Sequence, residues 1–407
     1  MKLRSKLIAL FCSCILSYSY AETPDFRWVG FGVEPTGGNG GNTYVVNTFS
    51  DLVRHASSSE RCIIKIDGRI YNGKKGGKVS VRSNKTLLGI GSDALLDGIG
   101  LELKDGVNNI IIQNLKLTMT GFTYRGEDDP NGTEESSIWD YDGDEGRPQI
   151  KMNDGDCIHI TNNVKNVWID HCELYNEDPA IQTNQDLYDG LIDVKRGCQF
   201  ITVSWCYIHD HYKCSLVGSS ASDTYDWKIT YHHNYYRNIR GRTPSYRGGT
   251  GHIFNNYWER CGEGVNARQR SSVYVEHNDF SGVSNNRRIF CADNNNQGTW
   301  TAVGNIANRT AISIANTNSM ERPNYDYVSV LEDASTVQAT VKAWAGVGKL
   351  NASTDVEKIS KDKGEIISEA YYTLSGIKIS QPVNKGIYIK RLVYQNGHTE
   401  TVKIMCQ

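Results

Sequence analysis

The chain has 407 residues, a formal net charge of −2 and a pI near 6.6. This balance excludes a globally basic protein that seeks nucleic acid, so any charged partner has to be recognised by a local surface. The 39 glycines and 23 tyrosines, against five methionines and eight prolines, favour a turn-rich all-β chain over a helical bundle.

Residues 1–21 have the pattern of a secretory signal. A basic start is followed by an apolar run at Leu7–Leu16 and by Ser19–Ala21 as a cleavage context. The apolar run is too short to span a membrane, and no other segment is long and apolar enough. The sequence therefore predicts a secreted protein without a membrane span, located extracellularly or on the outer surface, with the periplasm as an alternative.

Removal of this signal leaves nine cysteines, with no CxxC pair and no metal-binding Cys/His spacing. Most of them stand in strand-like runs, where a small buried hydrophobic side chain is the expected role: Cys157, Cys172, Cys206 and Cys214. The sequence assigns no disulfide.

Six apolar runs can be superimposed along the middle of the chain: Ile110–Leu117, Val167–Leu174, Ile201–Ile208, Thr230–Tyr236, Ile253–Trp258 and Val273–Phe280. Taking Asn114, His171, Trp205, His233, Asn256 and His277 as equivalent gives intervals of about 57, 34, 28, 23 and 21 residues. A strand, a polar bend rich in Asn and His, and another apolar run describe one coil of a right-handed parallel β-helix, whose bend asparagines can stack in ladders. A β-sandwich is the alternative, but its turns should recur every 8 to 12 residues or so.

Two segments interrupt or end this pattern. Residues 121–149 form a long acidic loop, which is interpreted either as a solvated excursion or as a cleft wall or extra cation site. From Asp333 to Leu350 the pattern becomes helical, with Val337, Val341 and Trp344 on one stripe. This helix is expected to close the β-helix domain, which is assigned to residues 22–350.

The remainder of the chain is predicted to form a linker and a small β module. Residues 351–364 are polar and rich in lysine, as expected for a linker. Residues 365–407 alternate between apolar and polar side chains, and Asn396-Gly397 is a strong hairpin signal.

Acidic residues line one predicted strand face. Alternation places Asp189, Leu191, Asp193 and Lys195 on one side and Ile192 with Val194 on the other. Asp154 and Asp156, two residues apart, are expected to form another pair on one face of a strand. Carboxylates from neighbouring coils, about 4.8 Å apart, can converge on Ca²⁺, although any single aspartate is more often a turn residue.

Basic residues gather nearby in the sequence. The segment Lys228–Trp258 has five Lys or Arg residues and no Asp or Glu. Pro244 has no backbone N–H to donate to a neighbouring strand. Arg242 and Arg247 are therefore expected to flank an irregular turn rather than lie within a strand. This charge suits a carboxylate or phosphate ligand, and a solvated basic surface is the alternative.

Several ordered motifs resemble those of polysaccharide lyase family 1, the pectate lyases. They are Trp168-Ile-Asp-His171, Asp189-Gly-Leu-Ile-Asp-Val-Lys195, Lys213 ahead of Leu-Val-Gly-Ser, Thr230-Tyr-His-His-Asn234 and Arg242-x-Pro-x-x-Arg247. Gly30-Phe-Gly and Ala345-Gly-Val-Gly-Lys resemble the two ends of that family, so the similarity spans about Gly30 to Leu350. The resemblance implies a right-handed parallel β-helix.

The resemblance also implies roles for individual residues. It implies Ca²⁺ coordination by Asp156, Asp189 and Asp193, with Asp154 as an additional acid, and Arg242 as the catalytic base. It implies that Lys195, Lys213 and Arg247 bind uronate carboxylates. Asp170 and His171 are interpreted as hydrogen-bonding framework residues rather than acid or base groups.

The implied activity is Ca²⁺-dependent β-elimination of de-esterified polygalacturonate by a secreted monomer. A pectin lyase acting on methylated chains, a hydrolytic polygalacturonase and a non-catalytic pectin-binding β-helix are the alternatives. Retention of the aspartates argues against the pectin lyase, and their place beside Lys195 and Arg242 favours elimination over hydrolysis. The C-terminal module resembles the sorting tails of Bacteroidetes secreted enzymes, with a plain accessory β domain as the alternative.

Overall fold

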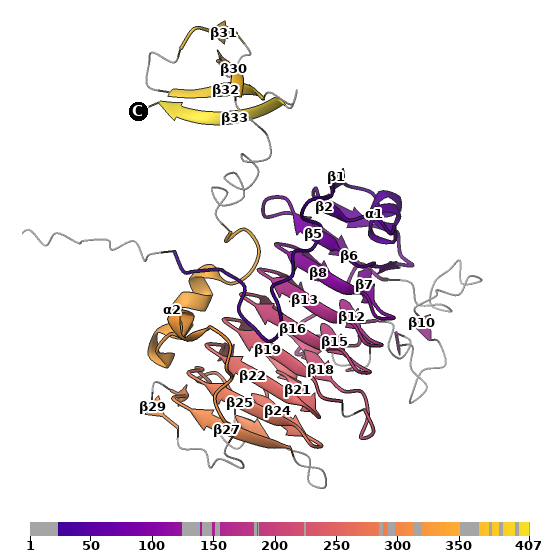
Figure 1. Ribbon diagram of the computed structural model, residues 1–407, viewed down its shortest axis with the longest axis vertical. Coiled ribbons are helices and arrows are strands. Elements are labelled where there is room, and N and C mark those ends of the chain that lie inside the picture. The colour runs from indigo at the N-terminus through magenta and orange to yellow at the C-terminus, as the bar shows by residue number, and fades with distance from the viewer. Residues whose placement is uncertain are drawn as a thin grey trace, which may run out of the picture.

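The computed structural model describes residues 23–123, 155–182, 185, 187–223, 225–284, 288–291, 298–308, 310–312, 320–350, 366–373, 377–381, 386–394 and 399–406, and the backbone of 139–140 and 149–150. Three sheets of parallel strands wind around a common core, so that successive coils stack along one axis (Figure 1). The predicted parallel β-helix is therefore confirmed.

Each complete coil adds one strand to each of three sheets, which are called A, B and C below. Sheet A holds β1 Asn42–Val46, β2 Cys62–Ile66, β5 Lys85–Gly89, β8 Asn108–Gln113, β13 Lys165–Asp170, β16 Gln199–Ser204, β19 Lys228–His232, β22 Thr250–Phe254, β25 Ser272–Glu276 and β27 Thr299–Val303. Sheet B holds β3 Arg69–Tyr71, β6 Leu95–Asp97, β9 Lys116–Thr118, β14 Glu173–Tyr175, β17 Tyr207–Lys213, β20 Tyr235–Gly241 and β23 Tyr257–Glu259. Sheet C holds β4 Gly77–Ser80, β7 Ile99–Leu103, β12 Ile158–Ile160, β15 Ile192–Val194, β18 Ser215–Val217, β21 Ser245–Arg247, β24 Val265–Arg268 and β26 Phe290–Cys291.

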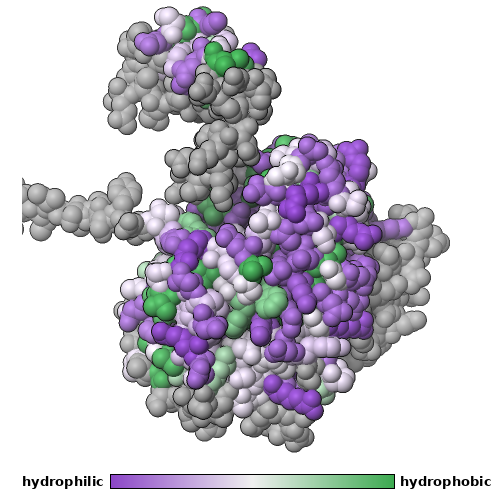
Figure 2. Space-filling view, viewed as in Figure 1, coloured by the Kyte–Doolittle hydropathy of each residue, from purple (hydrophilic) through white to green (hydrophobic). Residues whose placement is uncertain are grey.

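The core is a set of side-chain stacks along the axis. Because neighbouring strands of sheet A pair in register, one inward position repeats from coil to coil, and the stack that it forms comprises Leu87, Ile112, Ile169, Val203, Tyr231, Ile253 and Val275. All seven side chains are fully buried. The face drawn in Figure 2 is largely hydrophilic, as expected when the apolar side of each strand lies inside.

The bend after each strand of sheet A has a left-handed backbone. Asn114, His171, Trp205, His233 and His277 have φ between +47° and +54°, as the superimposed runs predict for one structural position. At the fifth coil this position is Asn255, with φ +50°, and the assignment to Asn256 was wrong by one residue. Phe254 pairs with both His232 and Glu276 at the last position of the ladder, so Asn255 follows the strand in register with His233 and His277.

An asparagine ladder follows the bends, as the sequence predicts. Asn234 Nδ2 donates to Asn256 Oδ1 at 2.9 Å, Asn256 Nδ2 to Asn278 Oδ1 at 3.0 Å, and Asn278 Nδ2 to Asn305 Oδ1 at 3.0 Å. All four side chains are buried. Since a buried amide left without a partner costs about 1–3 kcal/mol, the ladder fixes the register of these coils.

Helices cover parts of this scaffold. Helix α1, Phe49–Ala56, contacts β1, β2 and β4 and buries Leu52 and Ala56. Helix α2, Ala334–Trp344, begins after the capping residue Asp333 and packs Val337 and Val341 against Tyr257 of β23. The predicted helix is thus present but ends at Trp344 rather than continuing to Leu350. A single 3₁₀ turn, η4 Val328–Val330, precedes it.

The C-terminal residues form a four-stranded antiparallel sheet, in the order β31 Lys378–Ile379, β30 Ile366–Tyr372, β32 Gly386–Tyr394 and β33 Thr399–Cys406. Asn396-Gly397 lies outside the described residues, but Val393 and Thr399 on either side of it pair as expected for a hairpin. The signal at 1–21 and the linker at 351–364 also lie outside them, as does most of the acidic loop at 121–149.

Two short strand pairs complete the described chain. Two antiparallel pairs are formed by β10 Trp139–Asp140 with β11 Gln149–Ile150, and by β28 Ile306–Ala307 with β29 Thr310–Ala311. The four cysteines predicted to be small core residues are all fully buried. Of the cysteines whose side chains are described, all eight are free thiols.

Candidate active site

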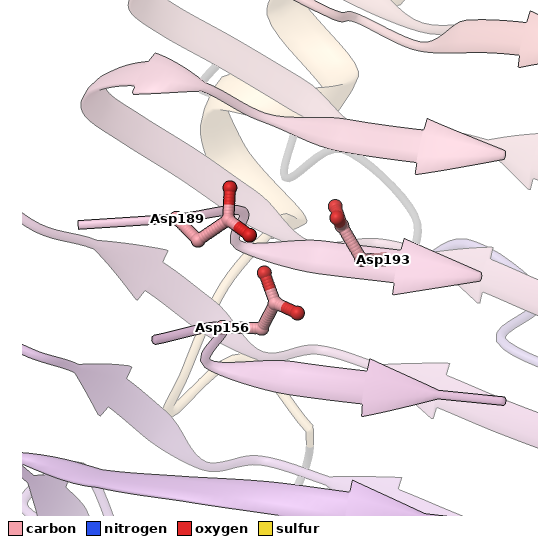
Figure 3. A group of neighbouring side chains, drawn as sticks. All are labelled: Asp156, Asp189 and Asp193. Carbon is pink, nitrogen blue, oxygen red and sulfur yellow. The ribbon is translucent and has the colours of Figure 1, made fainter. Parts of the chain in front are cut away.

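Three aspartates from two adjacent coils converge at β12 and β15, two neighbouring strands in the middle of sheet C. Asp156 precedes β12, Asp189 lies in the bend before β15, and Asp193 is the middle residue of β15. Their carboxylates point toward one another, and one oxygen of each lies within 4.8 Å of the others (Figure 3). The predicted convergence of carboxylates from neighbouring coils is therefore present for these three residues.

Two details of the predicted strand faces were wrong, and one lies beyond what the structure describes. Leu191 was placed beside the aspartates, but it is buried in the core together with Ile192, because regular strand geometry starts only at Ile192. Asp156 was placed within a strand, but it lies in the bend before β12. Asp154 lies outside the described residues.

Asp156 is held ionised by its neighbours. The Gly190 N–H donates to its Oδ1 at 2.7 Å, His159 Nδ1 lies 2.6 Å from its Oδ2, and Lys195 Nζ is 3.6 Å away. Burial by itself raises the pKa of this carboxyl, but Lys195 and His159 outweigh burial and lower it below its usual range. Asp156 is thus a fixed negative charge at the base of the cluster.

The other two carboxylates are less well compensated. Asp193 Oδ1 accepts a hydrogen bond from the Leu216 N–H at 3.1 Å, and its Oδ2 lies 3.1 Å from Lys195 Nζ. Burial and the nearby charge of Asp156 raise the pKa of Asp193 to about 6, and the same two causes raise the pKa of Asp189. A cation placed among the three oxygens would offset both the burial of these carboxylates and their repulsion by Asp156.

The packing around the cluster is specific. A Cβ at Gly190 would lie 2.1 Å from Asp193 Oδ1 and 3.0 Å from Asp156 Oδ1, so a side chain there would occupy the space between the carboxylates. Three oxygen ligands without thiolate or imidazole in the set suit a hard cation such as Ca²⁺. The donor set therefore fits the cation that the sequence predicted.

The backbone of Asp189 is anchored from the next coil. His211 Nε2 lies 2.5 Å from the Asp189 carbonyl oxygen, and burial lowers the pKa of this histidine to about 4. Lys213 Nζ lies 3.7 Å from Asp189 Oδ1. One neighbouring strand, β17, thus supplies both a neutral anchor and a cation to this aspartate.

Lys195 joins the acidic cluster to the outer face of sheet C. It is almost fully buried, at 4% exposure, and its ammonium contacts both Asp193 and Asp156. Burial opposes its charge, but the carboxylates outweigh burial and raise its pKa. Lys195 therefore remains a cation in this setting.

Arg242 stands at an irregular turn, as predicted. Its φ is +62°, its N–H donates to Glu263 Oε1 at 2.6 Å, and the peptide bond between Thr243 and Pro244 is cis. The Thr243 hydroxyl donates to the carbonyl oxygens of Glu263 and Gly264. The next coil thus fixes the backbone that presents Arg242.

Arg247 differs from its predicted setting. It is the last residue of β21 and pairs with Arg268 in the ladder, so it lies within a strand and not beside the turn. The turn caused by Pro244 is already complete at Ser245, where pairing with β18 begins again. Arg247 Nη1 donates to the Gly218 carbonyl oxygen at 2.6 Å, which orients the guanidinium along sheet C.

Acids and cations lie on one flank of the coil. Lys213, which contacts Asp189, lines a hollow of about 330 Å³ together with Arg242. Arg242 is also close enough to influence the charges of both Asp189 and Asp193. The structure therefore brings together the predicted acidic and basic residues, with Arg247 two strands farther along sheet C.

Asp170 and His171 belong to a different part of the molecule. They end β13 in sheet A, where His171 Nδ1 lies 2.7 Å from Asp170 Oδ2 and the Ser204 hydroxyl donates to Asp170 Oδ1 at 2.7 Å. Both side chains are fully buried. These contacts are those of the hydrogen-bonding framework that the sequence predicted.

Sequence reasoning missed two groups in the site. His159 contacts Asp156, and Glu263 contacts the backbone of Arg242. The signal for His159 was its position three residues after Asp156. The sequence signal that could have identified Glu263 is its separation of 21 residues from Arg242, which is one coil length in this part of the chain.

Comparison with known proteins identifies the family of this chain. The profile of a family described as "Pectate lyase" matches residues 32–350. A pectate trisaccharide-lyase of Bacillus licheniformis is 33% identical over 339 residues, covering 80% of this chain and 88% of that protein. Pectate lyase A of Emericella nidulans is 34% identical over 266 residues, covering 63% and 69%.

Solved structures show the same architecture. A pectate lyase of Bacillus sp. N165, solved in complex with trigalacturonate, superimposes with a TM-score of 0.61 at 29% identity, covering 78% of this chain and 97% of that one. The fold and the site define a polysaccharide lyase of the parallel β-helix type. The chain belongs to the pectate lyase family. Among the described residues, no helix has the length and apolar character needed to span a membrane.

Proposed function

We propose that this protein is a secreted pectate lyase that cleaves de-esterified polygalacturonate by Ca²⁺-dependent β-elimination. The observation that carries the proposal is the shared flank of the acidic cluster and the cationic hollow, joined by the contact between Asp189 and Lys213. Family membership and the trigalacturonate complex of the Bacillus sp. N165 relative support the same substrate class.

The residues of the site can be given distinct roles. Arg242 is proposed to take the proton from C5 of a galacturonate unit, and the electrons of that bond form a double bond between C5 and C4. The bond between C4 and the glycosidic oxygen breaks, and the leaving oxygen takes up a proton. Negative charge develops on the adjacent carboxylate, where Lys195, Lys213 and Arg247 stabilise it more strongly than in the ground state.

Asp156, Asp189 and Asp193 are proposed to hold Ca²⁺. When bound, the ion would supply positive charge to the substrate carboxylate as a Lewis acid. Burial and the charge of Asp156 raise the pKa of Asp189 and of Asp193, and a bound cation would offset both causes, which supports this assignment.

An arginine base has to be neutral at the moment of proton transfer, although an arginine side chain is ordinarily protonated in proteins. Lys213, Arg240 and Arg288 line the same hollow as Arg242. The assignment of Arg242 as the base is supported by the family motif Arg242-x-Pro-x-x-Arg247 and by the place of Arg242 in the hollow beside Lys213.

A product assay tests the activity. With demethylated pectin we expect release of unsaturated oligogalacturonides, seen as new ultraviolet absorbance, and complete loss of this signal on addition of a calcium chelator. Reducing ends without a double bond would identify a hydrolase. Higher activity on methylated pectin that persists with chelator would identify a pectin lyase.

The remaining assignments concern the organisation of the chain. We propose a cleaved signal at 1–21, the catalytic domain at 22–350, a linker at 351–364, and a C-terminal module at 365–407 that acts as a sorting tail, in a protein that works as a monomer. The separate antiparallel sheet β30–β33 supports the last boundary. Intact mass of the secreted protein should lack residues 1–21, and an unprocessed N-terminus would contradict the signal.

A further inference from the structure

The hollow beside Arg242 holds two arginines that the elimination chemistry leaves without a role, Arg240 and Arg288. The lining comprises Gln185, Tyr212, Lys213, Arg240, Gly241, Arg242, Glu263 and Arg288. Four of these side chains are cationic and one is acidic, so the hollow has a surplus of positive charge. None of the three clustered aspartates belongs to the lining.

Successive coils line this hollow, and its two arginines come from coils on either side of the coil that holds Glu263. Gly241, which follows Arg240, pairs with Lys213 of the preceding coil, so Arg240 lies next to that lysine along sheet B. Arg288 comes from the coil after Glu263, two coils after Arg242, and its carbonyl oxygen accepts a hydrogen bond from the Gly264 N–H at 2.9 Å. The backbone alone thus brings Arg288 beside Glu263.

Glu263 connects the two sides of the hollow. Its Oε1 accepts the N–H of Arg242, and its Oε2 accepts a hydrogen bond from Arg288 Nη2, both at 2.6 Å. The Glu263 side chain is 5% exposed, whereas that of Arg288 is 53% exposed. One buried carboxylate therefore orients a cation whose remaining nitrogens face solvent in the hollow.

This arrangement suits a ligand that carries carboxylates on successive units. A hollow of about 330 Å³ is of the size that small ligands occupy. Arg240 is exposed and makes no ion pair with any residue that the structure describes. Guanidinium groups bind carboxylates through two parallel hydrogen bonds, so Arg240 and Arg288 are suited to a uronate carboxylate.

We propose that Arg240 and Arg288 bind the carboxylate of a second uronate unit, adjacent in the substrate chain to the unit that reacts at Arg242. Glu263 is the positioning residue that holds Arg288 for this contact. The inference rests on the proposed function, since it takes an acidic polysaccharide as the substrate.

Kinetics of Arg240→Ala, Arg288→Ala and the double variant on polygalacturonate test the binding role. Loss of a contact present in both ground and transition states raises KM and leaves kcat nearly as it was, so we expect KM to rise about tenfold or more in the double variant. Arg82→Ala removes an exposed arginine near α1 and serves as the matched control. A KM for the double variant within twofold of this control would overturn the proposal.

Glu263→Gln tests the positioning role, because glutamine keeps an oxygen for the Arg242 N–H but loses the charge that holds Arg288. We expect the rise in KM of Glu263→Gln to match that of Arg288→Ala and to disappear in the Arg288→Ala background. An effect of equal size in both backgrounds would show that Glu263 acts independently of Arg288.

Calorimetric binding of trigalacturonate separates this inference from the proposed function. We expect about tenfold weaker binding by the double variant than by the wild type, whether or not the wild type forms an unsaturated product. Absence of that product would contradict the lyase activity alone. Equal affinities of wild type and double variant would overturn the second uronate site alone.

Discussion

Replacing Arg242 with lysine is expected to lower turnover of polygalacturonate by about a hundredfold to ten-thousandfold, the range typical for loss of a general base. Lysine keeps one positive charge but lacks the two terminal nitrogens and the length of the guanidinium. Its ammonium would therefore not reach the position at which arginine meets the C5 proton. Glu263 Oε1 accepts a hydrogen bond from the backbone N–H of residue 242, and the substitution leaves that hydrogen bond in place.

Substrate binding should persist in Arg242→Lys, because Lys195, Lys213 and Arg247 remain to contact the uronate carboxylates. Calorimetry with trigalacturonate should give a dissociation constant within about threefold of the wild type. Arg260→Lys is the control, since Arg260 is exposed and, like Arg242, has a left-handed backbone, with φ +53°. If Arg242→Lys turned over substrate at the rate of this control, Arg242 would have no part in proton transfer.

The architecture of the chain was predictable because its periodicity is repeated many times. Each coil has to bury the same inward position of sheet A, and the polar bend after it has to satisfy the same backbone groups, so both leave a mark in the sequence. Leu191 shows the limit of this reasoning. Bends of a β-helix also bury apolar side chains, and alternation alone could not show that the strand begins only at Ile192.

The site was predictable only in part, for a related reason. Asp189, Asp193 and Lys195 stand on one short segment, where spacing alone indicates proximity. Glu263 contacts Arg242 across a full coil, and coil length varies with the loops inserted between strands. The hydrogen-bonded register between strands determines which residues of neighbouring coils face each other. This register is known only once the strands have been paired in the structure.

Asp193 carries the second large expected effect. It is fully buried between Lys195 and the other two aspartates, and its raised pKa reflects burial and the charge of Asp156. Asparagine has nearly the same shape but no negative charge and a weaker oxygen ligand. Replacing Asp193 with asparagine therefore removes one of three carboxylates from the proposed cation site without leaving a cavity.

We expect Asp193→Asn to weaken Ca²⁺ binding by at least about tenfold, since changes to groups that only support metal ligands already cost that much. The measurement is the rise in Tm on addition of Ca²⁺, which grows with the ratio of free ion to dissociation constant and does not depend on turnover. Asp226→Asn, at an exposed acid outside the cluster, is the control and should keep the full shift. Because the three carboxylates meet around one point, an equal Ca²⁺-induced shift in Asp193→Asn would place the stabilising ion elsewhere on the protein.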